Sequence, residues 1–492
     1  MASTRTPPLH RHLDDLAGAL LLFQVVWAPW AFGCTTHWAV WVLNISGYLS
    51  LLALAGKALV RRRAPFTPER WSVPGHPAAI RLLGGLTVLF LGYVLVSALN
   101  ARAVVEIEEG GPRFTYRDAF IGWMPHSYDA RATWRGFWRY LALAGLFWGA
   151  RDWLVGKSRR ERRLEPEDRT AGLFPTDRVR LLLWVWVLSS ALLALVSILQ
   201  RLEGTEKLLW LIQPPVRAWG PFSFGPFAYR ANGAQYCNLL WPVTLGFWWA
   251  LHERYRLQAG MRVRAGGDPS LILLVLGGLM AACPVVTTSR GGALLLIAEG
   301  LAMVVLLSVA LRRAGKVMRR NMAGVLAVGV VAGAALGGRE LLQRFETVLT
   351  DNLSGRPVIY QTARRMAADH PVFGTGAETF PSLSALYRPD PDGKWEAYVH
   401  DDWLETRVSF GWVGFGLIVS MLATGVVAGL AGSGLPASPI FVASAGIGMA
   451  GLLAHAFLDF PFQVVGLLTS FLVVVALFSC LRLAPGPGGT GR

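Results

Sequence analysis

The chain has 492 residues, of which 53% are hydrophobic and only 16% are charged. This composition is too apolar for a soluble globular protein of such length and predicts a membrane protein. The formal net charge of +16 raises the alternative of nucleic-acid binding, but the basic residues gather in short clusters between apolar stretches, which is typical of topology signals.

Apolar stretches long enough to cross a hydrocarbon layer of about 30 Å as helices recur along the chain. We therefore predict an all-α polytopic fold with about twelve transmembrane helices. The first stretch lacks a small-residue cleavage site and is followed at once by the second, so we expect it to be retained as a helix. The expected spans lie near 15–33, 37–60, 80–100, 137–154, 181–200, 235–252, 270–287, 291–311, 321–338, 409–430, 437–457 and 461–482.

Basic clusters fall in alternate loops and begin at Lys57, Lys157, Arg254 and Arg312. Because cytoplasmic loops carry an excess of Lys and Arg, we expect both termini in the cytoplasm and an even number of spans. The outer side then receives the segments 101–136, 201–234, a turn around 286–291, and 339–408.

This topology divides the chain into four parts. Residues 1–338 are expected to hold nine spans, 339–408 a large outer loop, 409–483 three further spans, and 484–492 a disordered tail. The four cysteines lie in or beside predicted spans at no metal-ligand spacing, so we expect neither a disulfide nor a zinc site. These cysteines are Cys34, Cys237, Cys283 and Cys480.

The large loop carries most of the polar chemistry. In "SGRPVIYQTARRMAADHP" a helix is predicted to begin at Ser354 or Gly355 and to stop before Pro371, and the glycines of "VFGTGAETF" predict a tight turn. A second helix is expected to carry "YVHDDWLETRVSFGWVGFGLI" (398–418) into the tenth span. At helical spacing His400 and Arg407 would share one face, and the motif would stand at the outer rim of the membrane.

His400-Asp401, followed after nine residues by Gly411 and Gly414, resembles the histidine motif of the O-antigen ligase family. Three further segments are similar to that family, in the family's order: "FGPFAYRANGAQYCNLLWPVTLG" (224–246), with an Asn-centred helix entry; the Ser-Arg-Gly turn of "TTSRGGALLL" (287–296); and the Arg-containing helix and Gly-x-Gly turn before the histidine. The family's usual asparagine after the histidine is here Asp401. The resemblance implies a GT-C-like glycosyltransferase of the bacterial inner membrane.

The implied reaction moves a glycan from a polyprenyl (undecaprenyl) diphosphate to an acceptor hydroxyl on the periplasmic face, most simply O-antigen ligation to lipid A–core. Guanidinium groups bind diphosphate oxygens in a forked geometry, which suits Arg230, Arg290 and Arg356 on the outer side. The resemblance adds Asn232, Tyr360 and Arg407 to the substrate-binding residues. With no paired acidic motif for magnesium in view, we expect no metal and no cofactor.

The acceptor hydroxyl needs a proton acceptor that is poised near neutral pH, and histidine is the side chain with such a reference pKa. His400 is therefore the candidate general base, and Asp401, Asp402 or Glu405 can orient its ring; the sequence does not choose among them. His455 and Asp459, four residues apart in "HAFLDFPF" (455–462), can pair near the site.

Two alternatives stay open. Within the same superfamily the chain can be an O-antigen or exopolysaccharide polymerase or a protein O-glycosylation enzyme. A polytopic transporter or flippase would share the number of spans, but such proteins often show two similar halves and charges near the midplane, whereas here the polar chemistry lies at the outer rim.

Overall fold

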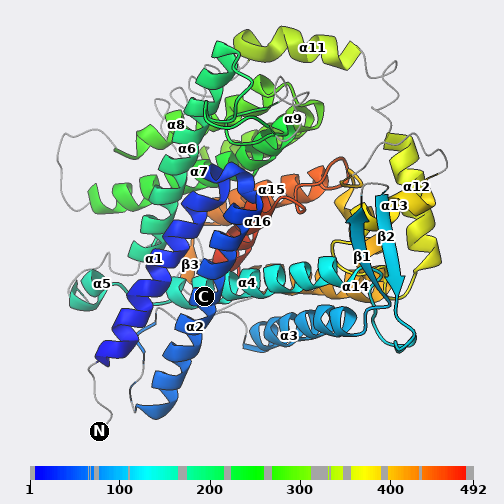
Figure 1. The fold of residues 1–492 in the computed structure, drawn as a ribbon. Coiled ribbons are helices and arrows are strands. Elements are labelled where there is room, and N and C mark those ends of the chain that lie inside the picture. The colour runs from blue at the N-terminus through cyan, green and yellow to red at the C-terminus, as the bar shows by residue number, and fades with distance from the viewer. Residues whose placement is uncertain are drawn as a thin grey trace.

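The computed structural model describes residues 6–64, 66, 68–70, 77–108, 111–164, 174–214, 223–259, 269–311, 331, 334–346, 356–388, 397–430 and 435–483, which are mostly helical (Figure 1). The helices are α1 (Pro8–Trp30), η1 (Phe32–Cys34), α2 (His37–Arg63), α3 (Pro77–Leu99), α4 (Ala130–Leu154), α5 (Arg159–Leu164), α6 (Asp177–Glu203), α7 (Arg230–Ala259), η3 (Pro269–Leu271), α8 (Ile272–Val286), α9 (Arg290–Leu311), η4 (Ala334–Gly338), α11 (Arg339–Glu346), α12 (Arg356–Asp369), α13 (Phe380–Tyr387), α14 (Asp402–Leu430), α15 (Pro439–His455) and α16 (Val465–Phe478). The strands are β1 (Ala103–Glu108), β2 (Gly111–Tyr116), β3 (Leu435–Ala437) and β4 (Leu481–Leu483).

Six of the described helices are long and apolar enough to cross a membrane, namely α2, α3, α6, η3 with α8, α9 and α14. Two shorter apolar helices, α15 and α16, follow them in the chain. Eleven of the predicted spans coincide with a described helix, whereas the one near 321–338 lies largely outside the described residues. The prediction of a helical integral membrane protein is confirmed, and the count of twelve spans stays a prediction.

Helix α7 occupies the centre of the bundle, where it packs against α8, α9 and α15. Every residue from Arg230 to Ala250 is buried, including the amides of Asn232, Gln235 and Asn238. Polar side chains in a membrane are expensive where they face lipid, so a helix that carries three of them is stable only where other helices surround it.

The segments that the sequence predicts to face outward form a small cap beyond the ends of α3, α4 and α14 (Figure 1). Ile359 and Ala363 of α12, Phe380 of α13 and Val399 share one apolar cluster, against which Phe114 of the β1–β2 hairpin packs. The hairpin is antiparallel, with Ala103 opposite Tyr116 and Glu108 opposite Gly111. It departs from the all-α expectation, which treated 101–136 as a plain loop.

A backbone joint ties the cap to α14. The amides of Thr375 and Gly376 donate to the carbonyls of Val408 and Ser409 (2.9 and 3.0 Å), and Trp412 N donates to Pro371 O (2.8 Å). Gly411 interrupts the helix at φ 57° and ψ −163°, and a Cβ there would lie 2.3 Å from the carbonyl oxygen of Val372. Only glycine fits this position, because it combines a left-handed φ with direct backbone contact.

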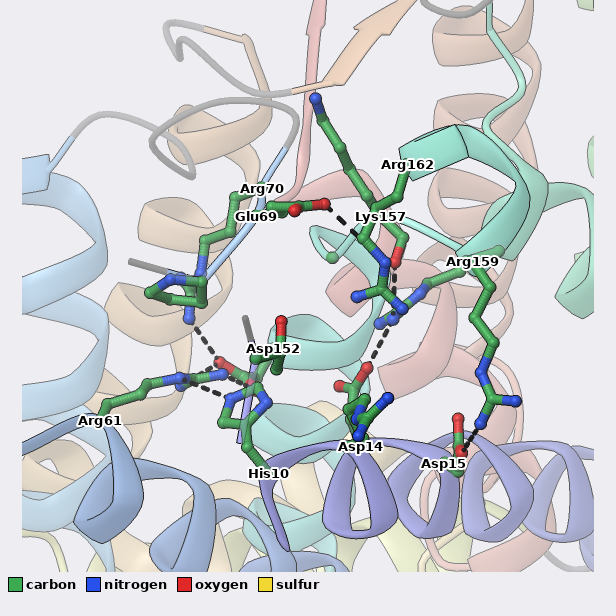
Figure 2. Close-up of a pocket in the computed structure, with 15 residues that line it drawn as sticks. His10, Asp14, Asp15, Arg61, Glu69, Arg70, Asp152, Lys157, Arg159 and Arg162 are labelled. Carbon is green, nitrogen blue, oxygen red and sulfur yellow. Dashed lines mark hydrogen bonds and ion pairs between the residues drawn. The ribbon is translucent and has the colours of Figure 1, made fainter. Parts of the chain in front are cut away.

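Charged side chains gather at the other end of the bundle, where α1 begins, α2 and α4 end and α6 begins (Figure 2). We call this the basic end; its core residues are Asp14, Lys57, Arg61, Asp152 and Arg178. Lys57 Nζ lies 2.5 Å from Asp14 and 2.6 Å from Asp152, and its side chain is only 1% exposed. Arg61 binds Asp152 through both terminal nitrogens, at 2.8 and 2.9 Å.

The basic end unites three of the predicted topology clusters. Arg70 and Gly156 form a β-bridge, and Arg254 Nη1 donates to Pro175 O (2.8 Å), which brings the clusters at Lys57, Lys157 and Arg254 together. The cluster at Arg312 lies outside the described residues. Alternate loops therefore meet at one end, as the basic pattern predicts, and the side of the membrane that this end faces stays a prediction.

Candidate functional site

The imidazole of His400 is the centre of the polar cluster at the opposite end, which we call the histidine end. His400 precedes α14 and adopts a left-handed backbone conformation with φ 60°. Its Nδ1 lies 3.0 Å from Asp459 Oδ1, and its ring packs edge-on against Phe460 with centroids 4.7 Å apart. The hydroxyl of Tyr360 donates to the His400 carbonyl (3.1 Å).

The expectation that His400 and Arg407 share one face of a helix is wrong, because the helix begins only at Asp402. Asp401 caps that helix by accepting a hydrogen bond from Leu404 N (3.0 Å) on its side chain. A residue that precedes an N-cap is free to leave the helical conformation, and His400 does so. Arg407 instead stacks on Trp412, with its guanidinium carbon 3.2 Å from the ring centroid.

Asp459 is the carboxylate that hydrogen-bonds to the imidazole. It lies between α15 and α16, its side chain is 4% exposed, and its amide donates to His455 O (3.0 Å). Burial alone would raise the pKa of Asp459, but the hydrogen bond and charge of His400, with the charge of Arg356, outweigh burial and hold the pKa below its ordinary value. An ionised carboxylate only accepts, so Nδ1 donates to it, and in the neutral ring Nε2 is then the nitrogen with a lone pair.

The three acids of the histidine motif hydrogen-bond to backbone amides near His400 and not to its ring. Asp402 accepts hydrogen bonds from Phe462 N (2.7 Å) and Gln463 Nε2 (3.0 Å). Glu405 accepts one from Val399 N (2.8 Å). With Asp401 at the helix cap, each of these acids has a backbone partner among the described residues. The sequence left open which carboxylate orients the His400 ring, and the structure offers Asp459 as a candidate.

The three predicted arginines each begin a helix: Arg230 begins α7, Arg290 begins α9 and Arg356 begins α12. These helix starts converge on the turn 455–460. Arg356 Nη1 donates to Leu458 O (2.7 Å), and a Cβ on Gly291 would lie 3.0 Å from His455 Nε2. Tyr229, directly before Arg230, places its ring 6.1 Å from that of His400.

The electrostatics of this convergence favour an anion. Helix N-termini carry partial positive charge, and the starts of three helices lie around this turn together with the guanidinium of Arg356. Burial alone would lower the pKa of Arg356, but Asp459, Tyr229 and Tyr360 outweigh it and raise that pKa, so the guanidinium stays charged. The arrangement can therefore attract an anionic group beside the His400 imidazole.

Asn232 lies in the first turn of α7 and is buried, and its Oδ1 has no hydrogen-bond partner among the described residues. A buried amide oxygen without a partner is costly, which suits a group that meets a ligand. Among the described residues no three His, Cys, Asp or Glu side chains form a metal-binding group, and metal independence stays a prediction.

Residues 275–419 match the family model described as O-antigen ligase. The match includes Arg290, Arg356 and His400, which confirms the resemblance seen in the sequence. Arg230 and Asp459 lie outside it, although the fold brings them to the same end. A search of curated proteins finds no match to this chain. Residues 275–419 are therefore similar to the O-antigen ligase family, and this similarity supports a membrane glycosyltransferase of the ligase or polymerase type.

Proposed function

We propose that this protein transfers a glycan from an undecaprenyl diphosphate to the hydroxyl of an acceptor on the periplasmic face of the bacterial inner membrane, with lipid A–core as the acceptor. The observation that carries the proposal is the convergence of three arginine-led helix starts on the His400–Asp459 pair. A guanidinium-rich anion site beside an imidazole suits a reaction in which a diphosphate leaves while a hydroxyl is deprotonated.

In the proposed step, His400 Nε2 takes the proton of the acceptor hydroxyl while the hydroxyl oxygen attacks the anomeric carbon. The bond between that carbon and the diphosphate oxygen breaks, and its electron pair stays on the diphosphate. Arg356, Arg290 and Arg230 stabilise the new negative charge, and Asp459 stabilises the imidazolium. Attack from the face opposite the leaving group inverts the anomeric configuration.

The supporting residues have distinct tasks in this proposal. Tyr360 holds the left-handed backbone of His400 through its carbonyl, and Asn232 offers a buried amide to the donor near Arg230. Asp401 and Glu405 fix the rim on which His400 stands. Arg407, stacked on Trp412 farther along α14, would contact the acceptor headgroup as it approaches from the membrane surface.

The test is deletion of the gene followed by chemical analysis of the surface polysaccharide. A ligase predicts lipid A–core without polymer and an accumulation of lipid-linked polymer. A polymerase predicts single repeat units on the core, and unchanged polysaccharide would count against both. In a purified reaction, transfer is expected to survive EDTA; a rate that collapses and returns with magnesium would contradict a site built on guanidinium groups alone.

A further inference from the structure

A cavity of about 240 Å³ lies between α3, α4, α14 and α16, and the proposed reaction gives it no role. Its walls are mainly hydrocarbon, with Phe90 of α3, Phe147 of α4, Met421 of α14 and Phe471 of α16 among the lining side chains. Several lining residues are only half-buried, including Leu91 and Ala144, so the cavity is open toward the surroundings of the bundle. For helices in a membrane, those surroundings are lipid chains.

One part of the cavity is polar. Asp402 and Gln463 line it and hydrogen-bond to each other at 3.0 Å. Glu378 also lines it, at a left-handed φ of 61° and in an ion pair with Arg139 Nη1 at 3.0 Å. A pocket with hydrocarbon walls and a few placed polar groups is the usual form of a site for an amphipathic ligand.

A short strip of chain separates the cavity from the candidate active site. Asp459 and Phe460 contact the ring of His400, whereas Phe462 and Gln463 line the cavity. Asp402, which is two residues after His400, belongs to the cavity wall. A molecule whose chain lies in the cavity therefore brings its headgroup to the histidine across a strip only a few residues wide.

Charge separates this approach from that of the donor. Among the described residues that line the cavity, none is Arg230, Arg290 or Arg356, and two are the carboxylates Asp402 and Glu378. The Glu378 carboxylate is already paired with Arg139, and the described lining of the cavity includes no arginine and no lysine, so the cavity offers a diphosphate no cation to bind. The diphosphate belongs with the arginine-led helix starts, and the second substrate belongs with the cavity.

We propose that the cavity binds a hydrocarbon chain of a lipid-linked acceptor and thereby delivers the acceptor hydroxyl to His400 from the side of α14 and α16. This inference rests on the proposed function, which defines the diphosphate-linked glycan as the donor and the hydroxyl-bearing lipid as the acceptor. It excludes a free sugar or a protein loop as the preferred acceptor, because neither would bury a chain in this cavity.

Photo-crosslinking tests chain binding without needing turnover. The full-length protein carries p-benzoylphenylalanine in place of Leu91, or in place of Ile297 on the exposed face of α9 as the control. The probes are acylated lipid A–core and an undecaprenyl-diphosphate glycan. We expect lipid A–core to crosslink at position 91 well above position 297. Equal labelling at both positions, or preferential labelling at 91 by the undecaprenyl probe, overturns the proposal.

A filled cavity tests the same idea through kinetics. Ala144→Trp places a ring in the cavity, and the matched control Ala302→Trp places one on the exposed face of α9. Displacing about two methylene groups corresponds to about tenfold in affinity. We expect Ala144→Trp to reduce the preference for acylated over deacylated core about tenfold, with the KM for the donor unmoved. An unchanged preference, or a shift in the KM for the donor instead, overturns the proposal.

The two experiments separate the proposals from each other. If the protein transfers no glycan but position 91 still crosslinks lipid A–core selectively, the proposed function fails and chain binding in the cavity stands. If transfer proceeds while neither the crosslink nor the preference behaves as expected, the proposed function stands and the cavity proposal fails.

Discussion

The basic end and the histidine end of the bundle are built from the same kinds of side chain, but they differ in how far the protein itself completes them. At the basic end, Lys57 is enclosed by Asp14 and Asp152, and Asp152 also receives Arg61 and Arg70. Arg178 takes the other oxygen of Asp14. Each of these charges has an opposite charge within hydrogen-bond distance.

The histidine end differs from the basic end in its partners rather than in its exposure. The His400 side chain is 23% exposed, close to the 20% of Arg61, but among the described residues only its Nδ1 has a hydrogen-bond partner. The starts of three helices lie around the same turn, and helix N-termini attract anions. A network in which every charge has an opposite partner holds a structure together, whereas a partly exposed imidazole beside three helix N-termini is suited to binding and chemistry.

The strongest test of this contrast is His400→Ala. General-base catalysis contributes about 10²–10⁴-fold, so the transfer rate should fall by that factor while the melting temperature of the purified protein changes little. His126→Ala is the control, because His126 lies between β2 and α4 and, among the described residues, hydrogen-bonds only to Met124 O nearby. Near wild-type turnover of the His400 variant would leave the motif with a structural role.

Lys57→Met should show the opposite behaviour. Removing one partner of a buried charge network leaves Asp14 and Asp152 without their shared cation, which costs about 3–5 kcal/mol of stability. We expect a large drop in melting temperature and, in the protein that remains folded, ordinary turnover. Lys207→Met, at an exposed lysine, is the control. A stable but inactive Lys57 variant would break the contrast between the two ends.

Asp459→Asn should slow transfer about 10²-fold or more, because an amide can neither stabilise the imidazolium nor fix the same tautomer. Asp401→Asn is the informative comparison, since Asp401 caps α14 and does not contact the ring. We expect the Asp401 variant to lose far less in kcat than the Asp459 variant. The reverse order would return the orienting role to the motif's own acids.

Arg356→Lys keeps the positive charge but loses the planar guanidinium, which can bind two oxygens at once. We therefore expect about a tenfold loss in kcat/KM for the diphosphate donor. Arg356→Ala should lose more, and neither change should move the KM for the acceptor. Arg131→Lys is the control, because its ion pair with Glu106 is exposed on the outer hairpin. Full activity of the Arg356 variants would remove this residue from the anion site.

The smallest expected effect is on stability in acid. The pKa of Asp459 is depressed in the folded protein, so its contribution is fully present above the ordinary aspartate pKa of about 3.9 and is lost as pH falls through the lower folded value. Melting temperatures of wild type and Asp459→Asn, compared from about pH 6 down to pH 3, should therefore converge as the pH falls. A gap that widens toward acid pH would contradict the depressed pKa.

The positions of most helices can be predicted from the sequence, because long apolar runs mark the spans and alternating basic clusters mark the loops between them. Eleven expected spans coincide with described helices, and the helix before Pro371 ends at Asp369 as predicted. The β1–β2 hairpin was missed, although "VVEIEEGGPRFTY" (104–116) shows alternating polarity around a Gly-Gly pair. A loop that faces away from the membrane is not constrained by span length, so only local pattern could have revealed it.

The candidate site divides in the same way. His400 and the three arginines can be found from their motifs, because each lies beside a glycine or a helix start. The partnership of Asp459 with His400 cannot be found in this way, since 59 residues and two helices separate them. His455 seemed the natural partner of Asp459 from its spacing of four, but that spacing brings the Asp459 amide to the His455 carbonyl while the carboxylate turns to His400.

The joint between the 371–376 turn and the break at Gly411 has a consequence for which residues of the cap can vary. The amides of residues 375 and 376 hydrogen-bond to the carbonyls of residues 408 and 409, so the two ends of the segment 377–407 are held next to each other. Lengthening a closed excursion costs little loop entropy and does not displace its ends. Residues in the middle of this segment can thus be exchanged without moving the first turns of α14, whereas positions 374 and 411 require glycine.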